Sequence, residues 1–208
     1  MSTEQPSGQS SGSDRPATPS DPGAVTQEIR HSQISARVPE KVSRGVFSTG
    51  AIVLQGPQEF VLDFVLRMAQ PHMVAARIIL PPSVMPRMIA ALRENFQNFQ
   101  QRFGAPPPLP TPPPAAAPPS IEEIYDQLKL PDEALSGVYA NVVMISHSPS
   151  EFCFDFITNF FPRSAVSCRV FLASQQIPRL LDTLSRSFEQ FQKRFTQPPP
   201  QNPPSPVG

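Results

Sequence analysis

The sequence lacks the features of several protein classes. It contains no tryptophan, two cysteines, and equal numbers of basic and acidic side chains, 17 of each. A zero net charge argues against a protein built mainly to neutralise nucleic-acid phosphates. Two cysteines cannot supply a disulfide framework, and they indicate a reducing compartment. No apolar run approaches the roughly 20 residues that span a bilayer, and the polar N-terminus lacks the apolar core of a signal peptide. We therefore expect a cytoplasmic protein without a membrane segment.

Proline is abundant instead, with 29 residues in a chain of 208. It helps to define three segments: an N-terminal tail (1–37), a polyproline linker (105–119) and a C-terminal tail (197–208). Such compositions bury too little apolar area to offset chain entropy. All 15 phenylalanines lie in the two segments between these tracts. We therefore predict two small folded units, disordered ends and a stiff linker that acts as a spacer rather than as a ligand for aromatic grooves.

The two folded units are copies of each other. A shift of 92 residues lays 38–104 onto 130–196 without a gap, and 19 of the 67 pairs are identical. Both copies end in the same Phe-x-x-Phe-Gln-x-Arg-Phe pattern. An ungapped match of this length indicates a duplicated domain.

Each copy has the pattern of three antiparallel strands followed by one helix. β-branched and alternating apolar residues mark the strands, which we place at 46–54, 59–64 and 74–80, and again 92 residues later. A stripe of apolar residues at helical spacing follows, with Ser83 and Ser174 as N-caps. The predicted fold class is α+β, with two tandem βββα repeats.

A unit of this size buries too little apolar area to be more than marginally stable on its own. The first strand is also apolar on both faces, with Val46 and Ile52 on one and Phe47 and Val53 on the other. We therefore expect the copies to pack on each other as an intrachain pseudo-dimer. The segment 120–129 begins with a Ser-x-x-Glu capping box, which predicts a short amphipathic helix that docks on the second copy.

The second copy resembles a known family in its strand and turn residues. It reads Val138-Tyr139-Ala140-Asn141, Ser148-Pro149-Ser150-Glu151-Phe152, Asp155-Phe156, and then Ser174 at the helix start. This is similar, over nearly all of 130–196, to an uncharacterised prokaryotic family, domain of unknown function 3467 (DUF3467). The first copy keeps the Glu-Phe and Asp-Phe pairs but lacks Tyr-Ala-Asn, and both copies have Pro-Arg where the family has Ala-Lys. Family members usually carry one such domain, so the resemblance implies a covalent form of a homodimer, and it implies no activity.

Carboxylates recur at equivalent positions of both copies. Glu59 and Asp63 lie four residues apart on one strand, about 13 Å, whereas the carboxylates of glycosidases lie roughly 5–10 Å apart. We predict structural ion pairs instead. These would be cross-strand pairs on the outer sheet face, between Asp63 and Arg77 and between Asp155 and Arg169.

The other chemistry-bearing residues form no recognisable site. His31, His72 and His147 are scattered and lack further ligands at metal-binding spacing, so we expect no metal and no cofactor. Cys153 and Cys168 have opposite strand parity, which predicts opposite sheet faces and no disulfide. The sequence has no glycine-rich phosphate motif and no nucleophile elbow. We therefore expect a protein that is not an enzyme.

Binding functions remain. Apolar residues on both faces of the first strand, together with free strand edges, suit the capture of extended polypeptide, so we predict a scaffold or adaptor with a protein partner. The alternative is a single-stranded nucleic-acid-binding protein, because paired strand–helix repeats resemble the pseudo-dimers of PUR-type proteins. Phenylalanines at core-facing positions disfavour that alternative. The residues predicted to form a binding surface are Arg67, Arg87, Arg179, Tyr139 and Asn141.

Overall fold

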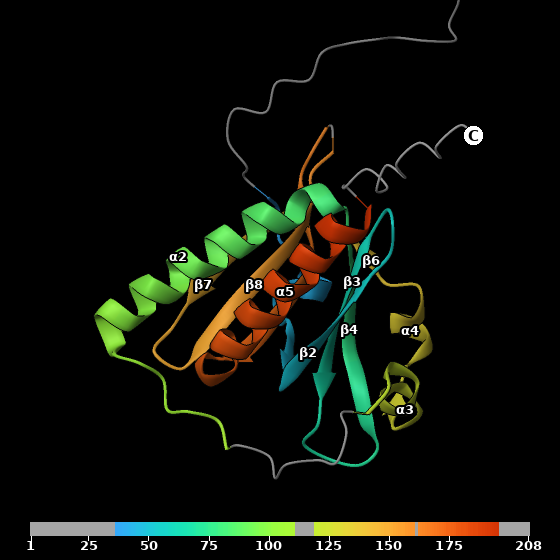
Figure 1. The fold of residues 1–208 in the computed structure, drawn as a ribbon. Coiled ribbons are helices and arrows are strands. Elements are labelled where there is room, and N and C mark those ends of the chain that lie inside the picture. Colours follow the sequence, from blue (N-terminus) through green and yellow to red (C-terminus); the bar gives the residue numbers. More distant parts are fainter. Residues whose placement is uncertain (1–35, 111–118, 161, 196–208) are drawn as a thin grey trace, which may run out of the picture. The chain divides into compact units, whose positions relative to one another are not determined.

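The computed structural model describes residues 36–110, 119–160 and 162–195, so most of the predicted tails lies outside the described residues. The fold is mixed α and β, with two sheets and two long helices packed against them (Figure 1). Sheet A has the strand order β1-β9-β8-β7, and sheet B has the order β2-β3-β4-β5, with β6 also paired to β4.

The strands and helices have the following bounds. The strands are β1 Val46–Ser48, β2 Gly50–Gln55, β3 Phe60–Leu66, β4 His72–Leu80, β5 Leu128–Lys129, β6 Val138–Tyr139, β7 Val142–His147, β8 Glu151–Thr158 and β9 Ala165–Ala173. The helices are α1 Glu40–Ser43, α2 Met85–Phe103, α3 Ile121–Asp126, α4 Asp132–Leu135 and α5 Ile177–Phe195.

One core lies between the sheets and the long helices. The predicted alternation in the second strand of each repeat is confirmed, because its inward residues are fully buried: Phe60, Leu62 and Phe64 in β3, and Phe152, Phe154 and Phe156 in β8. The apolar stripes of α2 and α5 join the same cluster, through residues such as Leu92, Phe99, Leu184 and Phe191. The repeats therefore share a core instead of burying two separate ones.

The first strand of each repeat is broken, so the prediction of one strand over 46–54, and again over 138–146, is wrong. β1 and β2 are separated at Thr49, where the Ser48 hydroxyl lies within hydrogen-bond distance of the Gly50 and Val65 carbonyl oxygens, at 2.7 and 3.0 Å. The two halves join different sheets. Each half therefore finds its own partner, which explains why the predicted strand is apolar on both faces.

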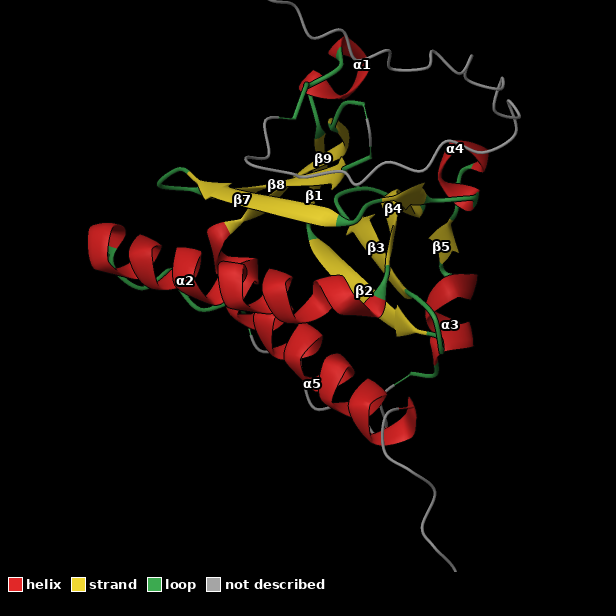
Figure 2. Cartoon of the chain, turned by 90° about the horizontal axis from the view of Figure 1, so that it is seen from above, coloured by secondary structure: helices red, strands yellow, loops and turns green. Residues whose placement is uncertain are grey.

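Strands and helices are exchanged between the repeats. β1 of the first repeat pairs in parallel with β9 of the second, and β6 of the second pairs in parallel with β4 of the first. Figure 2 shows α2 running along β7 and α5 along β2, and these elements are in contact. The ring centroids of Phe99 in α2 and Phe152 in β8 are 5.4 Å apart, and those of Phe191 in α5 and Phe60 in β3 are 5.2 Å apart. Each long helix therefore packs on strands of the other repeat.

Ser83 and Ser174 do not cap the long helices as predicted. Each lies in a short 3-10 turn, Pro82–Val84 or Ser174–Gln176, that leads into α2 or α5, and no side-chain cap is formed at these turns or at the start of α2. Proline occupies the second position of both helices. For Ser83 the third residue onward is Pro86, which has no N–H, so a serine cap there would lack one of the two donors that it normally binds.

The segment 120–129 docks on the first repeat, not on the second as predicted. Ser120 and Glu123 form the predicted capping box, but the helix is shorter than expected and gives way to β5, which pairs in parallel with β4. The Tyr125 hydroxyl donates a hydrogen bond to Asp63 of the first repeat. The exchange of strands between the repeats explains why this segment lies on the first repeat. The chain enters the second repeat through β6, and β6 pairs with β4 of the first repeat, as β5 does.

The N-terminal tail is shorter than the predicted 1–37. Arg37 pairs in parallel with Ala165 of β9, and its backbone N–H donates to Ser164 at 3.0 Å. This bridge is equivalent to the pairing of Lys129 with Met73 in the other half of the molecule. Arg37 therefore belongs to the folded part of the chain.

Candidate functional site

Both predicted ion pairs are present across neighbouring strands. Arg77 donates two hydrogen bonds to Asp63, at 2.8 and 2.7 Å, and Arg169 donates two to Asp155, at 2.6 and 2.8 Å. The pairs differ in exposure, because the Asp63 side chain is fully buried whereas that of Asp155 is 19% exposed. Tyr125 makes the difference by covering Asp63 and donating its hydroxyl to it. The pairs join neighbouring strands at matching positions of the two repeats.

The hydrogen-bonded Tyr125 predicts a dependence of stability on pH. Burial raises the pKa of Tyr125 above its ordinary value of 10.0, and Asp63 raises it further. The folded state disfavours the tyrosinate. The contribution of the protonated Tyr125 to the free energy of unfolding should therefore be fully present below about pH 10. Above that pH it should fall by at most about 1.4 kcal/mol per pH unit. Tyr125→Phe should remove this part of the alkaline slope.

The measurement is urea unfolding of both proteins at several pH values between about 8 and 11, followed by circular dichroism. Burial also raises the pKa of the Cys168 thiol, to about 11. That thiol contributes to the alkaline loss in both proteins, so the difference between the two slopes is the readout. Equal slopes would show that Tyr125 does not titrate differently in the folded and unfolded chains.

The histidines and cysteines do not converge. Within the described ranges no group of three or more potential metal ligands occurs, and His31 lies outside those ranges. Cys168 is buried in the core, whereas Cys153 lies at the opposite parity on the next strand, and both are free thiols. Neither residue type marks a site, so the grooves of the surface are the remaining candidates.

A groove of about 510 Å³ follows the edge of β2 beside the first turns of α5, and we call it the β2 groove. Both repeats contribute to it. Besides β2 residues it is lined by Thr49 and Arg67 from the first repeat and by Leu172, Arg179 and Leu180 from the second. The predicted surface residues Arg67 and Arg179 therefore lie in one groove.

An equivalent groove, also of about 510 Å³, follows β7 beside the first turns of α2, and we call it the β7 groove. Arg87, Tyr139 and Asn141 line it together with Val143 of β7. Arg87 and Arg179 occupy matching positions in the 92-residue shift. The five predicted surface residues are thus divided between two related grooves and do not form one surface.

β2 and β7 are edge strands, and neither pairs with a further strand among the described residues. The Gly56 N–H donates to the Glu59 carbonyl at 2.8 Å, and an equivalent bond begins the β7–β8 ladder. Because such bonds alternate along an antiparallel pair, the N–H and C=O groups of Ala51, Val53 and Gln55 turn away from β3. Neither strand contains the proline or the Lys, Arg, Asp or Glu side chains that usually protect an edge. Both grooves therefore follow a largely apolar edge strand that carries neither proline nor a charged side chain.

The β2 groove also carries two positive charges at one end. Arg67 Nη1 lies 4.0 Å from the point that a β-carbon on Gly50 would occupy, which places this guanidinium at the start of β2. Partial burial lowers the pKa of Arg67, and the charge of Arg179 lowers it further. Among the described residues no carboxylate forms an ion pair with either arginine. The pair of arginines is therefore available to an anion.

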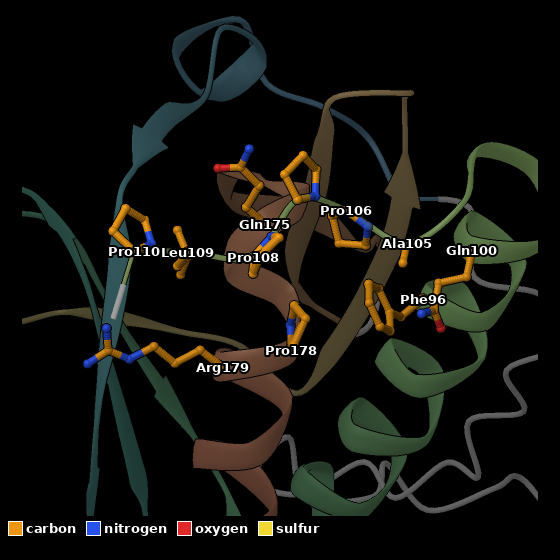
Figure 3. Close-up of a pocket in the computed structure, with 11 residues that line it drawn as sticks. Phe96, Gln100, Ala105, Pro106, Pro108, Leu109, Pro110, Gln175, Pro178 and Arg179 are labelled. Carbon is orange, nitrogen blue, oxygen red and sulfur yellow. The ribbon is translucent and has the colours of Figure 1, made fainter. Parts of the chain in front are cut away.

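A third cavity, of about 670 Å³, adjoins the β2 groove through Arg179 (Figure 3). The start of the linker, Ala105–Pro110, lines it opposite Phe96 and Pro178. In Figure 3 the Arg179 side chain extends from α5 away from Phe96, toward the strands of the first repeat. The predicted spacer 105–119 is thus described only at its ends, because residues 111–118 lie outside the described residues.

Sequence reasoning expected free strand edges but did not identify β2 and β7 as these edges, and it missed the apolar side chains that line the β2 groove, such as Leu172 and Leu180. One signal was available for the edge. The segment 50–55 is strand-forming and carries no charge and no proline, which is unusual for a strand exposed at an edge. No signal in the sequence shows that residues of the other repeat complete the groove.

The fold and the grooves define a class of protein: two tandem α+β repeats that share one core and form a groove at each junction. The family model of a protein of unknown function, DUF3467, matches the chain twice, at residues 9–109 and 110–197. The chain therefore belongs to the DUF3467 family, and the resemblance inferred from the motifs is confirmed. No curated protein and no solved structure matches the chain. Of the helices that the structure describes, none is both long and apolar enough to cross a membrane.

Proposed function

We propose that the protein is a non-enzymatic scaffold or adaptor that binds extended polypeptide as an added strand on β2. The observation that carries the proposal is the apolar edge strand β2, which has no proline and no charged side chain and lies beside a groove. An extended peptide would satisfy the outward backbone groups of Ala51, Val53 and Gln55, and the groove would receive alternate side chains. We expect this binding to take place in the cytoplasm.

The proposal includes the architecture of an intrachain pseudo-dimer. Its support is the reciprocal pairing of β1 with β9 and of β6 with β4, at registers that match under the 92-residue shift. The pseudo-dimer has a functional consequence, because each groove combines an edge strand of one repeat with a helix of the other. Binding at either groove would therefore depend on both repeats.

Ala51→Pro tests the proposed edge pairing. Proline removes an N–H that faces away from β3, so the β2–β3 ladder stays intact while an added strand loses a hydrogen bond and meets the proline ring. The probe is a pool of fluorescein-labelled hexapeptides in which threonine alternates with valine, isoleucine, leucine or phenylalanine. We expect binding, measured by fluorescence anisotropy, to weaken at least roughly 10-fold.

The matched control is Ala51→Val, because Val143 occupies this position in the second repeat. It keeps the N–H and should bind the peptides as the wild-type protein does. Thermal unfolding of both variants checks that the fold is retained. Unchanged binding by a folded Ala51→Pro protein, or no binding of the pool to the wild-type protein, would contradict the proposal.

Single-stranded nucleic acid is the second candidate ligand. The observation in its favour is the exposed pair Tyr139 and Phe160, whose rings stack with centroids 5.9 Å apart. Tyr139 also lines the β7 groove together with Arg87. A protein of this kind would bind oligothymidine. The logarithm of its binding constant would fall with the logarithm of the salt concentration, with a slope near −0.7 per neutralised phosphate. A slope of about −3 or steeper, together with weaker binding by Tyr139→Ala and a reduced slope for Arg87→Gln, would favour this candidate over polypeptide.

A further inference from the structure

The edge of β2 ends at Gly50, and this limits what can pair with it. Beyond Gly50 the chain passes through Thr49 into β1, which belongs to sheet A. Leu172 of β9 pairs with Ser48 of β1 and also lines the β2 groove. The other repeat therefore closes the groove at this end. A strand added to β2 must end or turn away beside Gly50.

The two arginines lie at the closed end. Like charges at close range repel each other, so holding both guanidiniums there is unfavourable unless an anion compensates them. Among the described residues neither arginine has an ion-pair partner. An anionic group at the end of an added strand would supply the missing charge.

The β7 groove shows that the fold does not need this pair. Under the 92-residue shift the position of Arg67 is held by Asn159. The Asn159 N–H donates to the Asn141 side chain at 2.7 Å, and the Asn141 amide donates to the Asn159 carbonyl at 3.1 Å. These two bonds link the residues that correspond to Thr49 and Arg67, and neither residue is charged. Arg87 is therefore the one arginine among the residues that line the β7 groove. The second arginine is therefore a property of the β2 groove alone.

We infer that the β2 groove binds the carboxyl terminus of a polypeptide strand, and that Arg67 and Arg179 hold its terminal carboxylate. The inference rests on the proposed function, to which it adds the direction and the end of the added strand. A strand antiparallel to β2 runs toward Gly50, so its last residue reaches the arginines. Guanidinium groups bind a carboxylate through paired N–H···O bonds. Leu172 and Leu180 line the groove, so an apolar last residue is expected.

The test compares the hexapeptide pool in two forms, with a free carboxyl terminus and with a terminal amide, on the full-length protein. Amidation removes the terminal charge and replaces one carboxylate oxygen by an NH2 group, and the rest of the peptide stays the same. We expect the amide to bind the wild-type protein roughly 10- to 100-fold more weakly than the acid, as for the loss of hydrogen bonds to a charged group. The double variant Arg67→Gln/Arg179→Gln should bind acid and amide equally, at the level of the wild-type amide. Arg87→Gln, the matched control in the β7 groove, should keep the preference for the acid.

The outcomes separate this inference from the proposed function. If acid and amide bind the wild-type protein equally, and Ala51→Pro weakens both, the edge pairing stands and the assignment of the carboxyl terminus is wrong. If neither form binds the wild-type protein, both fail. Oligothymidine binding that is lost in the double arginine variant, but not in Ala51→Pro, would assign the arginines to nucleic acid and overturn the inference.

Discussion

Replacing Phe99 by alanine is expected to lower the free energy of unfolding by about 3–5 kcal/mol. Phe99 is 2% exposed, and its ring centroid lies 5.4 Å from that of Phe152 and 5.7 Å from that of His147. Both partners belong to the second repeat, whereas Phe99 belongs to the first. The substitution would therefore open a cavity at the contact between a helix of one repeat and the sheet of the other. Urea unfolding followed by circular dichroism measures the loss.

A double-mutant cycle shows whether the contact across the repeats causes this loss. Phe99→Ala combined with Phe152→Ala should give a coupling energy of about 0.5–1.5 kcal/mol, the usual range for an aromatic pair. Phe103→Ala is the control on the same helix face, because Phe103 is 39% exposed and should cost far less. A loss below about 1 kcal/mol for Phe99→Ala would mean that α2 does not cover sheet A in solution.

The elements of the fold could largely be predicted from the sequence, because their signals are local. The alternation of Phe60, Leu62 and Phe64 and the stripe that contains Phe99 depend only on the spacing of residues along one strand or one helix. The partners of these elements could not be predicted. Both repeats carry the same apolar pattern, so the stripe of α2 fits the sheet of either repeat equally well. The choice between them depends on contacts far apart in the sequence.

The candidate site shows the same limit. The sequence placed Arg67 and Arg179 on one predicted binding surface with Arg87, Tyr139 and Asn141, since an arginine outside the apolar pattern is expected at the surface. The convergence of Arg67 and Arg179 on one groove requires α5 of the second repeat to pack beside β2 of the first. That arrangement follows from the exchange, which local patterns do not encode. The exchange breaks the first strand of each repeat, and in the first repeat the break falls at the polar residues Ser48 and Thr49. These two residues can be recognised as a break only after the two sheets are known.

Replacing Arg77 by alanine should also lower the free energy of unfolding by about 3–5 kcal/mol, because it leaves a buried carboxylate without its counter-charge. The Asp63 side chain is fully buried and would keep only the hydroxyl of Tyr125 as a partner among the bonds described above. The matched substitution in the second repeat is Arg169→Ala. It should cost roughly 1 kcal/mol, because Asp155 is 19% exposed and water can solvate it. Urea unfolding of both variants measures the difference.

This asymmetry between two equivalent ion pairs tests where the segment around Tyr125 docks. If α3 lay on the second repeat, as the sequence alone predicted, Asp63 would be as accessible as Asp155 and the two substitutions would cost the same. Removing both charges in Asp63→Asn/Arg77→Met should cost less than Arg77→Ala alone, since no uncompensated charge then remains in the interior. Equal losses for Arg77→Ala and Arg169→Ala would place α3 away from β3. A larger loss for Arg77→Ala, reduced in the double variant, would show that α3 buries the Asp63–Arg77 pair in solution.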